Sequence, residues 1–139
     1  MKAVPKHKKL TVSRLAEAGG VGLTTVRFYQ QRGLLAQPDK PRYGGPRVYA
    51  EADVRQLLLI KGAQTLGFTL AEIKVLIDNF DRRKCLSIKA AIDQKLQELN
   101  NRMREIRTAK RKLGQLAKSC SGSCIGECSL IERIRSVSS

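Results

Sequence analysis

The feature that most limits how this chain can fold is a long segment without helix breakers. Residues 86–113 contain neither glycine nor proline, and apolar residues recur from position 88 to 116 at steps of mostly three and four residues. This is the period of a coiled coil, and it predicts one helix from Ser87 to Ala117, roughly 46 Å long at 1.5 Å per residue. A lone helix of that length cannot bury its apolar stripe. We therefore expect it to pair with the same helix of a second copy, the alternative being that it packs back on its own chain.

The first half of the chain contains shorter segments separated by turn signals. The stretch TVSRLAEAGG predicts a short helix that ends at Gly19 and Gly20, and GLTTVRFYQQRGLL predicts a second helix that ends at Gly33. Two short helices joined by a glycine-containing turn are typical of a helix-turn-helix. Residues 36–46 hold three prolines and two glycines, so they predict a loop, and residues 47–49 (RVY) predict a strand. Loop and strand together predict a β-hairpin wing.

Two further helices are predicted before the long one. Residues 51–66 form the first, and a capping box of Thr69 and Glu72 starts the second. Their predicted inward faces consist of Val54, Leu57, Leu58, Gly62 and Leu66, and of Ile73, Leu76, Ile77 and Phe80. The predicted fold is mainly α. Its parts are a basic flexible tail (1–9), a winged helix-turn-helix domain (10–82), an antiparallel coiled-coil dimerisation helix (85–118), and a cysteine-rich segment with a short terminal helix (119–139).

The charge of the chain indicates a polyanionic partner. Lys and Arg number 27 and Asp and Glu number 12, which gives a net charge of +15. A helix-turn-helix with this charge is expected to bind double-stranded DNA, by neutralising phosphates and by reading bases in the major groove. We expect Phe28 in the core. The candidate DNA contacts, each of which could instead be ordinary solvated surface, are Thr24, Thr25, Arg27, Tyr29, Gln31, Arg32, Arg42, Tyr43, Arg47, Tyr49 and Lys61.

Hydropathy bears on where the protein acts. No apolar run approaches the roughly 18 residues that a membrane span needs. No apolar stretch follows the basic N-terminus, so no secretory signal is indicated. We therefore expect a cytoplasmic protein without a membrane partner.

The cysteines indicate metal chemistry. Cys120, Cys124 and Cys128 lie within nine residues, and Cys85 stands just before the long helix. Clustered thiolates in a reducing compartment bind soft cations, although a disulfide, idle thiols and an iron–sulfur cluster are alternatives. The long helix keeps Cys85 and Cys120 of one chain far apart. They can meet only when two helices run antiparallel, which predicts two metal sites per dimer, each bridging the protomers.

The motifs resemble those of the MerR family of bacterial transcription regulators over almost the whole chain. The resemblance is carried by TVRFYQQRGLL, by RVYAEADV, by LGFTLAEI and by a cysteine that opens the long helix. It implies a dimer that binds an inverted repeat inside a promoter with an overlong spacer. It further implies that the protein represses without effector. Effector binding then bends and untwists the DNA so that RNA polymerase can use the promoter.

The resemblance is strongest to the mercury-responsive members. It implies that Cys85 of one protomer and Cys120 and Cys128 of the other bind mercury(II) through three thiolates. The loop between Cys120 and Cys128 has seven residues where eight are usual, and Cys124 lies in its middle. This fourth thiol could support zinc, cadmium or lead, or serve as an entry or exit ligand.

Two other classes of function fit parts of the sequence. One alternative is a DNA-binding module in which the cysteines hold a permanent structural zinc. Another is a sensor of redox state or of an organic effector, for which the chain has no room for a large binding domain. No glycine-rich phosphate loop is present and His7 is the only histidine, so we do not expect an enzyme.

Overall fold

The computed structural model describes residues 9–120, 122 and 128–138. The chain divides into two compact units, residues 1–92 and 93–139. Throughout the described part the regular structure is helical, and no β-strand occurs there. The helices are α1 (Val12–Gly19), α2 (Leu23–Gln31), α3 (Glu51–Thr65), α4 (Leu70–Asp81), α5 (Cys85–Lys118) and α6 (Ser129–Val137).

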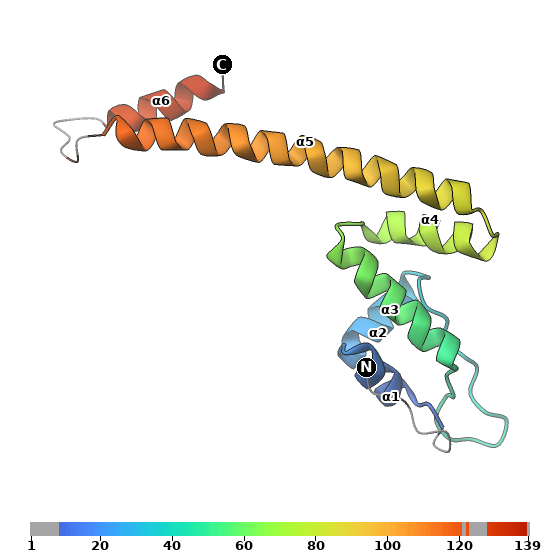
Figure 1. Cartoon of the computed structure of the whole chain (residues 1–139). Coiled ribbons are helices and arrows are strands. Elements are labelled where there is room, and N and C mark those ends of the chain that lie inside the picture. The colour runs from blue at the N-terminus through green and yellow to red at the C-terminus, as the bar shows by residue number, and fades with distance from the viewer. Residues whose placement is uncertain (1–8, 121, 123–127, 139) are drawn as a thin grey trace. The chain divides into compact units, whose positions relative to one another are not determined.

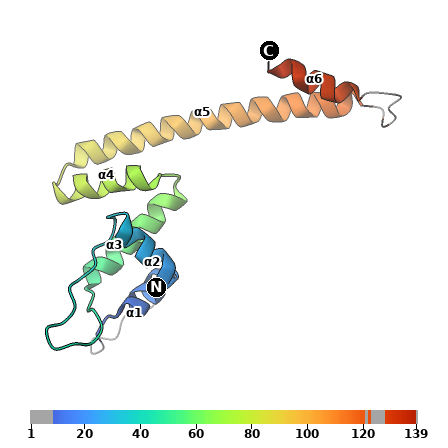
Figure 2. The ribbon, with the colours of Figure 1, turned by 180° about the vertical axis from the view of Figure 1, so that it is seen from behind.

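The first unit is built around α3, which packs against α1 and α4, while α1 also packs against α2 (Figures 1 and 2). The pair α1 and α2, joined by a short turn, forms the expected helix-turn-helix. The first two turns of α5 belong to this unit, because Ile88 and Ala91 pack against its core. The largest fully buried side chains of the core are Leu15, Val26, Leu57, Ile60 and Ile73.

The turn of the helix-turn-helix depends on two adjacent glycines. Gly20 ends α1 in the left-handed conformation (φ 64°), and its N–H and that of Val21 donate to carbonyls of the last turn of α1. Left-handed backbone at a helix end favours glycine. Gly19 is needed for a different reason. A Cβ atom at this position would lie 2.3 Å from Cδ2 of Leu57, so the missing side chain lets α1 approach α3.

The wing differs from the predicted β-hairpin. Among the described residues its backbone makes one antiparallel bridge, in which the Tyr49 N–H donates to the Leu10 carbonyl at 2.8 Å, and residues 47–49 form no strand. The tip is a turn in which the Gly44 N–H donates to the Pro41 carbonyl, and Gly44 and Gly45 both have positive φ. Pro38, Pro41 and Pro46 cannot donate ladder hydrogen bonds, so a loop replaces the hairpin.

The buried faces of α3 and α4 differ from the predicted ones. On α3 Leu57 is buried as predicted, but Ile60 and Ala63 are buried in place of Gly62, which is exposed, and Leu66, which is 65% exposed. On α4 Ile73, Leu76 and Ile77 are buried as predicted, but Phe80 is exposed. The capping box is confirmed: the Glu72 N–H donates to Oγ1 of Thr69, and the Thr69 N–H donates to Oε1 of Glu72 at 2.9 Å.

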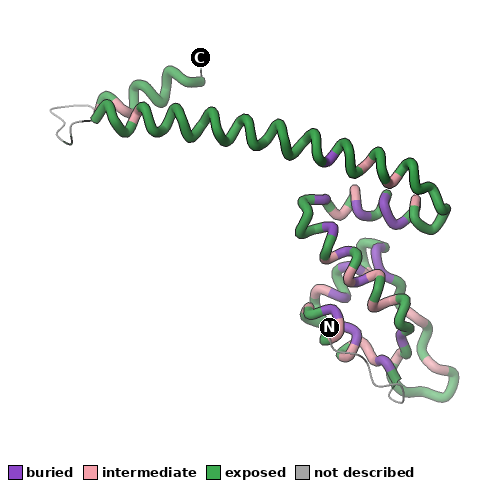
Figure 3. Tube along the Cα trace, viewed as in Figure 1, coloured by how far each residue is buried: buried purple, intermediate pink, exposed green. Residues whose placement is uncertain are grey.

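In the second unit the apolar stripe of α5 is exposed. From Asp93 onward the described residues of α5 are nearly all accessible apart from Lys95 (Figure 3). The accessible stripe includes Leu96, Leu99, Met103, Ile106 and Leu113, which are 38–61% exposed. Helix α6, the predicted short terminal helix, begins at Ser129, and together with α5 it lines a groove of about 830 Å³. Among the described helices, none is long and apolar enough to cross a membrane.

Candidate DNA-binding surface and thiol groups

Helix α2 presents a polar face. Thr24, Arg27 and Gln31 are exposed and lie at i, i+3 and i+7, which places them on one side of the helix. The opposite side buries Val26 and Tyr29 in the core. A helix held in this way can place its exposed side chains in a major groove, where Arg is suited to guanine and Gln to adenine. Thr25, another predicted contact, is half-buried beside this face.

The end of α2 corrects one prediction. Phe28, predicted to lie in the core, is 38% exposed. The guanidinium of Arg32 lies over its ring, 5.1 Å from the centroid, which is a cation–π geometry. Both side chains therefore border the polar face of α2, and Phe28 supports Arg32 rather than filling the core.

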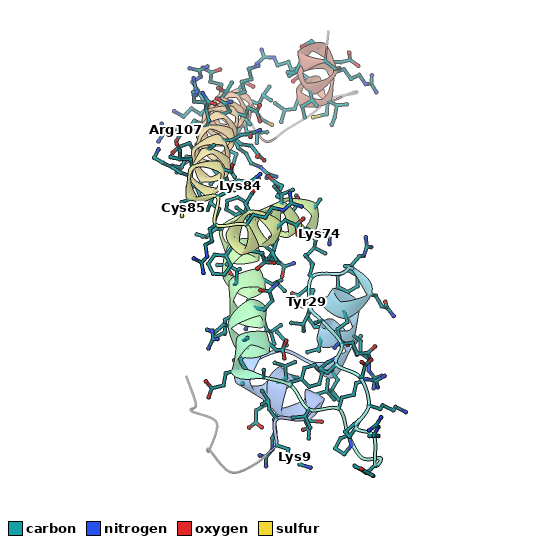
Figure 4. All side chains as sticks on the ribbon, turned by 90° about the vertical axis from the view of Figure 1, so that its right-hand side faces the viewer. Lys9, Tyr29, Lys74, Lys84, Cys85 and Arg107 are labelled. Carbon is teal, nitrogen blue, oxygen red and sulfur yellow. The ribbon has the colours of Figure 1, made fainter. Side chains whose placement is uncertain are left out.

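Two predicted contacts, Tyr29 and Tyr49, are buried instead, with 4% and 5% of their surfaces exposed. The Tyr29 hydroxyl lies between α2 and α3 (Figure 4) and donates to Oε1 of Gln64 at 2.6 Å. Burial raises the pKa of Tyr29 above its usual value. The Tyr49 hydroxyl accepts a hydrogen bond from Nε2 of Gln30 at 2.9 Å. A phenol can fill a core when its hydroxyl finds a partner, so these rings hold α2 and the wing in place.

The wing keeps part of its predicted surface. Arg42 and Tyr43 are exposed, Tyr43 almost completely. Arg47 is half-buried, and its Nε donates to the Pro38 carbonyl at 2.7 Å, which ties the two arms of the loop together. One part of this guanidinium is thus used to brace the wing, while Arg42 remains suited to a phosphate.

Lys61 is not a free surface cation. Its Nζ donates to the carbonyls of Gly19 and Gly20 at 2.8 and 3.3 Å, at the end of α1. Lys74 of α4, which the sequence did not single out, donates to the Gly33 carbonyl just beyond α2 at 3.3 Å (Figure 4). Nothing in the local pattern predicts these pairs, because each joins residues about forty positions apart.

The thiols occupy the ends of α5. Cys85 is the exposed first residue of α5 (Figure 4), Cys120 is exposed just after its last residue, and Cys128 is half-buried at the start of α6. Cys85 and Cys120 are free thiols. Cys124, the fourth predicted ligand, lies outside the described residues. Within the described part of one chain, no group of three His, Cys, Asp or Glu residues is placed to hold a metal ion.

The helix-turn-helix, the polar face of its second helix and the basic wing define a DNA-binding transcription regulator. The profile "MerR HTH family regulatory protein" matches residues 10–79, and the profile "MerR, DNA binding" matches residues 54–116. The chain belongs to the MerR family of transcription regulators, and it is not an enzyme.

Its relatives include metal-response regulators. The mercuric resistance operon regulatory protein of Serratia marcescens is 40% identical over 81% of this chain and 78% of its own length. The structure of the regulator PbrR691 from Ralstonia metallidurans CH34, in complex with lead(II), is 29% identical, with a TM-score of 0.77 over 88% of this chain and 97% of that one. The structure of MerR from Bacillus megaterium MB1 in complex with mercury(II) is also 29% identical, with a TM-score of 0.69 over 88% and 96%.

Proposed function

We propose that this protein is a metal-responsive regulator that binds promoter DNA as a homodimer and has mercury(II) as its effector. In this proposal residues 10–82 bind DNA, residues 85–118 form the dimer and residues 119–139 hold the metal. The observation that carries the proposal is the placement of free thiols at both ends of α5. Similarity to a mercuric resistance regulator at 40% identity supports it.

The length of α5 supports a site shared between two copies. The helix runs without interruption for 34 residues, which corresponds to about 50 Å. Cys85 and Cys120 of one chain therefore cannot bind the same ion. An antiparallel pair of α5 helices brings Cys85 of one copy to Cys120 and Cys128 of the other, and it covers the exposed apolar stripe. Each dimer then has two sites with three thiolates each.

Three thiolates suit a soft cation such as mercury(II). A solved relative binds mercury(II) and another binds lead(II), so the fold accommodates both ions. Cys124 could complete a four-thiolate site, which would suit zinc, cadmium or lead. Mercury(II) is preferred here because the mercuric regulators are the relatives with higher identity.

Regulation follows from differential binding. A metal that joins the end of one α5 to the start of the other can shift an equilibrium only if it binds one dimer conformation better. Cys85 directly follows α4 and its short connection, so the ion acts next to the unit that carries α2. We propose that the metal-free dimer represses, and that the metal-bound dimer distorts the promoter so that RNA polymerase can use it.

A metal competition on the reduced, full-length protein tests the proposal. Mercury(II), zinc, cadmium and lead are titrated in turn against excess small thiol while thiolate charge-transfer absorbance and stoichiometry are recorded. We expect mercury(II) alone to be retained, at one ion per chain, and to be lost in Cys85→Ser. Cys124→Ser is the matched variant and should keep mercury(II). Retention of cadmium, lead or zinc that requires Cys124 would instead assign the protein to the broader divalent-metal sensors.

A second measurement separates a sensor from a structural metal site. Transcription from the target promoter is measured with the metal-free protein, with mercury(II), and with Cys120→Ser and Cys128→Ser. A sensor requires repression in every metal-free sample and activation only in the wild type with metal. If chelation unfolds the protein, as circular dichroism would show, the cysteines hold a permanent structural zinc and the proposal is wrong.

A further inference from the structure

Two lysines of the first unit donate hydrogen bonds to backbone carbonyls of the helix-turn-helix. Nζ of Lys61, on α3, donates to the Gly19 and Gly20 carbonyls at the end of α1, and Nζ of Lys74, on α4, donates to the Gly33 carbonyl after α2. Lys61 and Gly20 are 41 residues apart, and so are Lys74 and Gly33. Each of the two helices of the helix-turn-helix therefore has a lysine from α3 or α4 at or just beyond its C-terminal end.

The two helix ends are alike in needing a cation. Each is followed by a glycine with positive φ, Gly20 at 64° and Gly33 at 69°. The last carbonyls of a helix lack intrahelical partners and carry partial negative charge. This applies to the Gly19 carbonyl, which closes α1, whereas the Gly33 carbonyl lies one residue beyond the C-cap of α2. Neither α1 nor α2 has a basic residue in its last turn. Arg32 follows α2, but its guanidinium lies over the Phe28 ring.

The space around these glycines is fitted to the lysines. A Cβ atom at Gly20 would lie 3.2 Å from Nζ of Lys61, and a Cβ atom at Gly33 would lie 3.3 Å from Nζ of Lys74. Lys61 is half-buried, so its hydrogen bonds are shielded from water better than those of Lys74, which is exposed. Charge-assisted hydrogen bonds to backbone carbonyls are stronger than neutral ones, and shielding from water strengthens them further.

We propose that Lys61 and Lys74 are positioning residues for DNA recognition. They set the angle at which α1 and α2 stand on α3 and α4, and they do so through backbone carbonyls rather than through phosphate. Lys74 is the more direct of the two for base reading, because it joins α4 to the end of α2. The proposed positioning role of the two lysines goes beyond the proposed metal response. It rests only on DNA binding, which membership of the family establishes.

Positioning and phosphate contact predict different results. A lysine that neutralises one phosphate contributes about 1 to the slope of log affinity against log salt, and its loss weakens binding to all sequences alike. A positioning lysine leaves that slope unchanged. Its loss weakens binding to the preferred sequence, because base contacts in the groove require an oriented helix, and it leaves binding to random sequence nearly intact.

The test uses the full-length protein with Lys61→Met, Lys74→Met and Lys61→Arg. Lys112→Met, which removes one charge from the exposed surface of α5, is the matched control. The probes are a duplex selected by the wild-type protein from a random pool and a random duplex of equal length. Affinity is measured by fluorescence anisotropy over a range of salt concentrations. Amide hydrogen exchange of the free protein reports on the helix ends.

We expect Lys61→Met to weaken binding to the selected duplex about tenfold. Its slope of log affinity against log salt should equal that of the Lys112→Met control, and its affinity for random DNA should change little. The Gly20 and Val21 amides should exchange faster. Lys74→Met should act in the same direction, with faster exchange at Gly33 and Leu34, and Lys61→Arg should restore binding. A salt slope reduced by about 1 with equal losses on both duplexes would overturn the proposal, as would unchanged affinity and exchange.

Discussion

The close approach of α1 to α3 gives the sharpest test of the fold. Gly19 is buried, and a Cβ atom added there would lie 2.3 Å from Cδ2 and 2.8 Å from Cγ of Leu57, which is itself fully buried. Ordinary contacts between carbon atoms are about 3.5–4.0 Å, so Gly19→Ala forces either the Leu57 side chain or the whole of α1 to move. Overpacking of this kind costs about 1–3 kcal/mol.

Helix propensity acts in the opposite direction. Alanine is favoured over glycine within a helix by at most about 1 kcal/mol. Because the clash is more than 1 Å deep, we place its cost in the upper half of the overpacking range. Gly19→Ala should therefore lower the free energy of unfolding by about 1–2 kcal/mol. Gly62→Ala is the matched control on α3: a Cβ atom there meets nothing within 4 Å, so this variant should gain up to about 1 kcal/mol.

Urea unfolding followed by circular dichroism, at one fixed protein concentration, measures these differences. A double-mutant cycle then identifies the partner. Leu57→Ala alone should cost about 2–5 kcal/mol, but in the presence of Gly19→Ala its additional cost should be smaller by at least about 1 kcal/mol, since the clash is gone. Gly19→Ala as stable as the wild type, or additive effects in the cycle, would refute the argument.

Three further predictions concern the helix cap, the buried tyrosine and the DNA-reading face. Thr69→Ala should lower the free energy of unfolding, measured in urea, by about 1 kcal/mol, because the Glu72 N–H loses its side-chain acceptor. Thr69→Ser keeps a hydroxyl acceptor and should therefore retain most of the wild-type stability. Because the folded-state pKa of Tyr29 is raised, its contribution to stability is complete below the ordinary value of 10.0 and is lost as pH rises through the folded pKa. The free energy of unfolding, measured in urea at increasing alkaline pH, should fall less steeply with pH in Tyr29→Phe than in the wild type. Equal slopes in the two proteins would contradict this prediction. Arg27→Ala should weaken operator binding at physiological salt without altering metal stoichiometry, and an unchanged affinity would remove Arg27 from the reading face.

The helices and the family could be predicted from sequence because their signals are local. Each signal spans only a few residues. The structure confirms the capping box of Thr69 and Glu72, the glycines that end α1, and the long helix predicted from apolar residues three and four positions apart. The same holds for the motifs that identify the MerR family. Local backbone preference and helical periodicity act within one or two turns, so a single sequence contains them.

The side-chain roles on the DNA-binding unit were decided by tertiary structure. Tyrosine is a residue type that suits a DNA contact, but Tyr29 and Tyr49 are buried. Their hydroxyls form hydrogen bonds with Gln64 and Gln30, which lie on other elements. Phe28 is exposed although its chemistry suits a core. The direction of a side chain on a short helix depends on which neighbour covers it, and that neighbour is distant in sequence.

The same reason accounts for the wing and for the lysines. Sequence alone predicted a β-hairpin wing with a strand at residues 47–49, whereas among the described residues the wing makes one isolated bridge, between Tyr49 and Leu10, and no strand. Sequence alone predicted Lys61 as a DNA contact. Its place at the end of α1 follows from the packing of α3 against α1, which brings together charges and carbonyls more than forty residues apart. Local pattern thus determined which helices form, and long-range packing determined which side chains remain free to meet DNA.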